Sequence, residues 1–279
     1  MTIDTRPAAD QVARVADLLE QRVNRYDAVR DHRAVFAYLY LRLTRALEQG
    51  LRDGRPAFVD PEWIAELSRR LAMTYLTTMD AIDAWQARPR ASHRRTAVGP
   101  DDLPDTIARP WREVFAAASI RRSYVLEEIV FSMVAHMSYD LPLALRDLAA
   151  AGSGDAHDHI GDFQRMNTLL GTNIREVQTD VAKRYCRQLL FLEHLFIRDE
   201  LLLTDGGIRM LRADAWFNFD RLIQSSAAAD AQRTIGRITE DVIREFRHPG
   251  DPKLRILYGL LRRLVPARRE WPPATPDTG

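Results

Sequence analysis

Polar side chains recur along one face of the most apolar helical stretch of the sequence, in the segment AHMSYDLPLAL at 135–145 and the turns before it. His136 and Asp140 are four residues apart, so on a helix their Cβ atoms lie roughly 6 Å from each other. Glu128 and Ser132 continue the same face. Polar groups among apolar neighbours cost free energy unless they are paired or ligated. We therefore predict catalytic roles for His136, Asp140 and Glu128; the alternative is a structural pair in which Asp140, two residues before Pro142, caps the next helix.

A second group of candidate ligands lies in HIGDFQRMN at 159–167. His159 and Asp162 are three residues apart and share a helix face, and Asn167 follows five residues later. Together with His136 and Asp140, these side chains offer the mixed nitrogen and oxygen donors that zinc, manganese or magnesium accepts. The sequence thus predicts a divalent metal as cofactor. The alternative is that Asp162 is only a first-turn carboxylate and Asn167 a packing amide.

Three further residues are candidates for substrate binding. Arg212 and Trp216 are one helical turn apart, a spacing that allows the guanidinium to lie over the indole or to hold an anion. Tyr75 belongs to a polar stripe on an otherwise apolar helix. The alternatives are that Trp216 belongs to the core and that the stripe around Tyr75 is solvated. We predict a substrate anion on Arg212, which then has a catalytic as well as a binding role.

The elements that must position these residues are helices almost throughout. Apolar residues recur at helical spacing, and no alternating β-branched run, internal repeat or glycine-rich phosphate loop is present. We predict an all-α fold, a single-domain bundle of about eight to ten helices over residues 1–265, with a long loop at 88–110 and a disordered tail at 266–279. The expected helices cover 8–28, 32–50, 61–85, 111–139, 141–151, 159–171, 173–203, 208–224, 229–247 and 253–265.

Composition and charge exclude several classes of protein. The 279 residues include 40 Lys and Arg against 39 Asp and Glu, a net charge of +1, which argues against a nucleic-acid partner bound through bulk electrostatics. The single cysteine, Cys186, excludes a disulfide scaffold. No stretch approaches the roughly 18 apolar residues of a membrane span, and the first 20 residues lack a secretory signal. We expect a cytoplasmic protein with a small-molecule substrate and no membrane partner, and a homodimer stays open.

The motifs together resemble a bacterial domain-of-unknown-function family of all-helical proteins. The resemblance runs in order through about residues 30–225 and rests on AHxxxDL, DFxxxN and RxxxW, which correspond here to 135–141, 162–167 and 212–216. It implies that six residues form one site assembled from three helices: His136, Asp140, Asp162, Asn167, Arg212 and Trp216. This chain departs from the pattern in a longer loop at 88–110 and in Glu128, where a histidine is expected.

Three functions are compatible with these residues. The first is metal-assisted hydrolysis of a small anionic substrate, with His159 or Glu128 completing the metal shell or acting as base. The HxxxD element is also distantly similar to one in zinc-dependent phospholipase C, although the other ligands of that group are missing. The second is a metal-independent cyclase or isomerase of small-molecule biosynthesis, in which Asp140, His136 and Tyr75 move protons. The third is a non-catalytic helical binding module.

Overall fold

The chain folds into a single all-α domain, as the sequence predicts. The computed structural model describes residues 4–88, 98–119, 125–152, 155–188, 204–264, 269 and 271–272, and within these ranges no strand occurs. The α-helices are α1 (Arg6–Ala28), α2 (Ala34–Asp53), α3 (Pro61–Gln86), α4 (Arg109–Ala118), α5 (Val125–Ala135), α6 (Leu141–Ala151), α7 (Ile160–Tyr185), α9 (Asp205–Gln224), α10 (Ala228–Arg247) and α11 (Pro252–Leu264). Short helical turns are η1 (Pro100–Asp102), η2 (His136–Asp140) and η3 (Ala156–His159).

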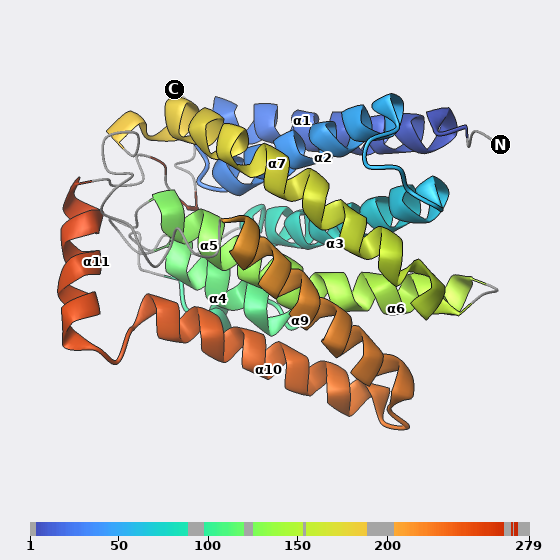
Figure 1. The fold of residues 1–279 in the computed structure, drawn as a ribbon. Helices are drawn as coiled ribbons and strands as arrows, with labels where there is room; N and C mark the ends of the chain where they lie inside the picture. Colours follow the sequence, from blue (N-terminus) through green and yellow to red (C-terminus); the bar gives the residue numbers. More distant parts are fainter. Residues whose placement is uncertain are drawn as a thin grey trace.

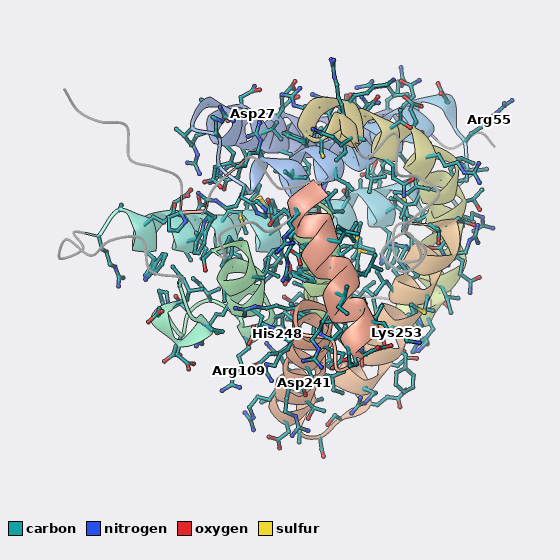
Figure 2. All side chains as sticks on the ribbon, turned by 90° about the vertical axis from the view of Figure 1, so that its left-hand side faces the viewer. Asp27, Arg55, Arg109, Asp241, His248 and Lys253 are labelled. Carbon is teal, nitrogen blue, oxygen red and sulfur yellow. The ribbon has the colours of Figure 1, made fainter. Side chains whose placement is uncertain are left out.

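The long helices form layers around one main core. Helices α1, α2 and α7 lie along one side, α10 lies along the opposite side, and α3, α5 and α6 run between them (Figure 1). Helix α9 packs on α6, α7 and α10 and so connects the two sides. Helix α11 crosses one end of the bundle, close to the turn at His248 (Figure 2). None of the described helices is long and apolar enough to cross a membrane.

Local sequence signals explain how the helices around the core begin and end. The Asp60 side chain accepts a hydrogen bond from the backbone N–H of Trp63 at 2.9 Å, and Pro61 occupies the first helical position of α3. Helix α2 ends at Gly54, whose φ of 65° lies in the left-handed region that glycine adopts without a steric cost. Along their length, both α2 and α3 bury their apolar faces in the core.

The segment that carries the histidine motif differs from the helix predicted over 111–139. Helix α4 ends at Ala118 and α5 begins at Val125, while residues 120–124 lie outside the described part of the chain. The five residues of η2 form a π-helical turn that continues directly into α6. Asp140 stands at the N-cap position of α6, but its dihedral angles are helical and its side chain makes no capping hydrogen bond, so the alternative in which this side chain caps the next helix is wrong. Its carboxylate instead faces the core.

At three further places the structure differs from the prediction, or the predicted residues lie partly outside the described ranges. Helix α7 runs without a break through residue 172, and the predicted helical residues 189–203 lie outside the described ranges. In the predicted loop, 89–97 lie outside as well. In the tail, Trp271 is 3% exposed; its ring stacks on that of Trp85 with the centroids 5.8 Å apart and lies 4.8 Å from that of Phe115. At this residue the predicted disorder is wrong, and most other tail residues lie outside the description.

Candidate functional site

His136 and Asp140 form the buried pair that their spacing predicts, and Trp111 completes it. Nδ1 of His136 lies 3.1 Å from Oδ2 of Asp140, and the side chains are 3% and 2% exposed. The indole N–H of Trp111 donates to both oxygens of Asp140, at 3.2 and 3.0 Å. Burial raises the pKa of Asp140, while the hydrogen bonds from His136 and Trp111 oppose that rise. Because Nδ1 faces a carboxylate, it carries the proton of the neutral ring, and Nε2 is left as an acceptor.

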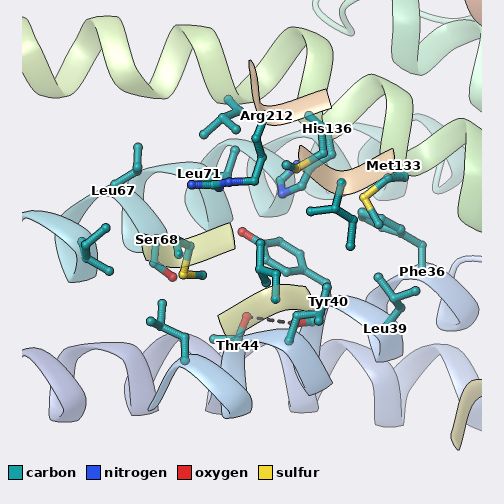
Figure 3. Close-up of a pocket in the computed structure, with 18 residues that line it drawn as sticks. Phe36, Leu39, Tyr40, Thr44, Leu67, Ser68, Leu71, Met133, His136 and Arg212 are labelled. Atoms are coloured by element: carbon teal, nitrogen blue, oxygen red, sulfur yellow. Dashed lines mark hydrogen bonds between the residues drawn. The ribbon is translucent and has the colours of Figure 1, made fainter. Parts of the chain in front are cut away.

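His136 lines a largely apolar pocket between α2, α3, α5, η2, α6, α7 and α9. The pocket is partly open and has a volume of about 90 Å³. His136 and Arg212 reach into it from one side and the Tyr40 hydroxyl from the other (Figure 3). Nε2 of His136 and the hydroxyl of Tyr40 are both buried without a hydrogen-bond partner among the described residues. Burial raises the pKa of Tyr40 far above its ordinary range, so this phenol stays protonated and available as a donor.

Arg212 enters the pocket from α9, and among the described residues its hydrogen-bond acceptors are neutral. Its Nε donates to Oδ1 of Asn167 at 2.6 Å, and its Nη2 donates to the backbone carbonyl of Phe163 at 2.7 Å. The guanidinium carbon lies 3.9 Å from the centroid of the Phe163 ring. The predicted stacking partner Trp216 instead packs against Phe163, with the centroids 4.9 Å apart, and does not line the pocket. Asn167 thus positions Arg212.

Glu128 lies on the same face as His136 but pairs with a different histidine. Oε2 of Glu128 is 2.6 Å from Nδ1 of His32, and both side chains are almost fully buried. The Ser132 hydroxyl donates to Oε1 of Glu128 at 3.4 Å. Burial is the largest single influence on His32 and lowers its pKa, but the charge and hydrogen bond of Glu128, together with the charges of Asp31 and Glu127, outweigh it and raise that pKa. The structure therefore contains a second His–carboxylate pair, which does not line the pocket.

Asp162 and His159 lie at the beginning of α7, against the beginning of α3. Oδ1 and Oδ2 of Asp162 accept the backbone N–H groups of Val59 and Asp60 at 2.9 and 2.6 Å. The ring of His159 stacks on Trp63 with an interplanar angle of 3° and a centroid separation of 4.7 Å, and its Nδ1 lies 3.7 Å from Oδ2 of Asp60. Both side chains thus connect α7 to α3.

The five predicted metal ligands therefore do not form one group. His136 and Asp140 bond to each other, Asn167 holds Arg212, and Asp162 and His159 face the α3 N-terminus. Within the described ranges no three His, Cys, Asp or Glu side chains are arranged to hold a metal ion. Of the six residues that the family resemblance groups together, His136 and Arg212 line the pocket. Asp140 is hydrogen-bonded to His136, and Asn167 is hydrogen-bonded to Arg212.

Three residues that contact predicted site residues were not singled out from the sequence. Tyr40 follows Phe36 by one turn on α2 and reads as core, and Trp111 and His32 are far in sequence from the carboxylates that they contact. The only signal for His32 is its position between Asp31 and Arg33, at the start of an apolar helix. The predicted substrate residue Tyr75 lies behind the pocket wall, with its ring 5.7 Å from that of Tyr40 and 5.9 Å from that of His136.

Comparison with known proteins identifies a family but no function. Residues 12–248 match the family model described as a family of unknown function (DUF5995), which covers every site residue above and excludes α11. No curated protein and no solved structure matches the chain. The chain belongs to this family, which confirms that the ordered motifs identify a family of unknown function.

Proposed function

We propose that this member of the family is a metal-independent enzyme of the isomerase or cyclase class, in which His136 is the general base. The observation that carries the proposal is that Nε2 of His136 has no hydrogen-bond partner among the described residues, on a ring that lines an apolar pocket and that Asp140 holds from the other side. A base works best when its tautomer and orientation are fixed and water is largely excluded. The contact with Asp140 supplies the first condition and the apolar lining the second.

The residues of the site can be assigned complementary roles. Nε2 of His136 removes a proton from a carbon next to a carbonyl of the substrate, and the electron pair moves onto the carbonyl oxygen. The Tyr40 hydroxyl donates a hydrogen bond to that oxygen, which stabilises the developing charge. His136 then returns the same proton to another carbon, so the substrate is isomerised without loss or gain of atoms. Asp140, fixed by Trp111, stabilises the imidazolium that forms in between.

Neutral pent-4-en-2-one, a small β,γ-unsaturated ketone, is a suitable probe, because its isomerisation to the conjugated ketone is followed by ultraviolet absorbance. We expect the full chain to accelerate this reaction well above free imidazole at the same concentration. His136→Gln keeps the size of the side chain but removes the base, and should lower the rate about 10²- to 10⁴-fold. Phe219→Leu, in the core and away from the pocket, is the matched control and should leave the rate unchanged.

Chelation distinguishes this proposal from the metal-assisted hydrolase that the sequence also suggests. We expect the isomerisation rate to be the same with and without EDTA, since no step involves a metal. A rate that falls in EDTA and returns with zinc or manganese would overturn the metal-independent assignment. A wild-type rate no higher than that of imidazole, or an unchanged rate in His136→Gln, would overturn the role of His136.

A further inference from the structure

The charge on Arg212 has no counterion among the described residues. Arg212 is 4% exposed, and its hydrogen-bond acceptors, an amide oxygen and a backbone carbonyl, are both neutral. Burial lowers the pKa of Arg212 to about 9, which expresses how strongly the surroundings disfavour the cation. A buried charge without a partner is costly, and an anion placed beside it recovers part of that cost.

The hydrogen bonds of Arg212 leave one edge of the guanidinium open. A guanidinium has five N–H donors in a planar fork. One on Nε and one on Nη2 are taken by Asn167 and Phe163, which fixes the plane of the group over the Phe163 ring. The donors that remain belong to Nη1 and Nη2, and two parallel N–H groups from these atoms match the two oxygens of a carboxylate.

The lining of the pocket sets the charge and the body of the ligand. Arg212 is the one lining residue with a fixed charge, so a single negative charge is balanced and a dianion is not. Tyr40, Thr44, Ser68 and His136 are the other polar lining residues. The remaining walls are hydrocarbon or thioether, contributed by Phe36, Leu39, Leu43, Leu47, Ile64, Leu67, Leu71, Met133, Met137, Leu141, Met166, Leu170 and Ile208. Such walls are suited to an unbranched or cyclic hydrocarbon body.

The cavity volume limits the size of that body. An apolar cavity of about 150 Å³ in another protein binds benzene, and the cavity here is about 90 Å³. A hydrocarbon body of fewer than about six carbons therefore matches this smaller volume. Longer chains require the walls to move apart, which costs packing free energy.

We propose that the pocket binds small apolar monocarboxylic acids, with the carboxylate on the open edge of Arg212 and the hydrocarbon body among the α2, α3 and α7 side chains. This inference rests on the proposed function in that it names the substrate class of the same pocket. The carboxylate anchor itself involves no proton transfer. Binding and catalysis therefore depend on different side chains, Arg212 for the first and His136 for the second.

Calorimetric titration of the full chain with hexanoate tests the anchor, with hexan-1-ol and hexyl phosphate as matched probes. We expect hexanoate to bind at least tenfold more tightly than hexanol, a difference that a paired buried charge readily provides. Arg212→Met keeps a long apolar side chain and should remove this preference. His136→Gln should bind hexanoate within about threefold of the wild type, although it loses isomerisation.

The results that would overturn the inference are distinct from those that would overturn the proposed function. Equal affinity for hexanoate and hexanol, or tighter binding of hexyl phosphate, would refute the monocarboxylate class, whatever the isomerisation assay shows. Since Arg212→Met can fail to fold, the wild type provides a second measurement. Hexanoate should shift the Nε–H resonance of Arg212 in a nitrogen–proton NMR spectrum and hexanol should not; no shift with hexanoate would likewise refute the anchor.

Discussion

Asp162 offers a direct test of whether a carboxylate in the family motif is a metal ligand or a structural acceptor. It is 2% exposed, and its two oxygens accept the backbone N–H groups of Val59 and Asp60, immediately before α3. Arg165 adds an ion pair at 2.9 Å, but its side chain is 43% exposed. If these contacts are its role, Asp162→Ala should destabilise the fold through the beginning of α3.

The expected size of the effect follows from the bonds that are lost. A hydrogen bond to a charged acceptor contributes about 1.5–3 kcal/mol, so losing two of them costs about 3–6 kcal/mol. The exposed pair with Arg165 contributes no more than about 1 kcal/mol. Asp162→Asn retains one acceptor oxygen and should lose about half of the total, about 1.5–3 kcal/mol.

Equilibrium unfolding in urea, with and without EDTA, measures these differences as changes in the free energy of unfolding. Asp158→Ala is the matched control, since Asp158 is an exposed carboxylate four residues earlier and should change stability by less than about 0.5 kcal/mol. Hydrogen exchange provides a local readout, because the amides of Val59 and Asp60 should lose protection in Asp162→Ala.

Two results would refute the structural role of Asp162. One is an Asp162→Ala variant whose free energy of unfolding lies within about 1 kcal/mol of the wild type. The other is a wild-type protein that EDTA destabilises by as much as the substitution does, because that is the behaviour of a metal ligand.

Three further predictions follow from individual contacts. Gly50→Ala should lower the free energy of unfolding in urea by about 1–2 kcal/mol, because the new Cβ would lie 2.4 Å from Leu169. The cost of this overpacking exceeds the gain in helix propensity. An unchanged or raised stability would contradict the prediction. Trp111→Phe removes the indole N–H from the buried carboxylate of the histidine pair and should cost at least about 2 kcal/mol, whereas an equal unfolding midpoint would show that the bond contributes nothing. Hydrogen bonds to Asp155 and Asp220 raise the pKa of His157 above its ordinary 6.5. The stabilising contribution of His157 is therefore full below pH 6.5 and is lost as the pH rises through the raised pKa. An NMR titration should show a lower pKa of His157 in Asp220→Asn, and an unchanged pKa would refute the contact.

The sequence determined the helical fold and the local part of the site. Apolar residues at helical spacing identify the buried face of each helix, and an i,i+4 spacing puts two side chains on one face wherever the helix is placed. The pairing of His136 with Asp140 depends on that spacing alone and is present in the structure. Where helix geometry itself changes, as in the π-helical turn of η2, periodicity gave no indication.

The partners of the remaining polar residues were decided by tertiary structure. Glu128 and Asp140 belong to one row in the sequence, yet one pairs with His32 on the chain before α2 and the other accepts from Trp111 on α4. Helical periodicity specifies which face is buried but not which helix packs against it. A buried donor or acceptor bonds to whatever complementary group that packing brings within reach. The same reason explains why Asp162 bonds to the backbone before α3 and why Arg212 alone keeps its charge without an opposite one among the residues that line the pocket.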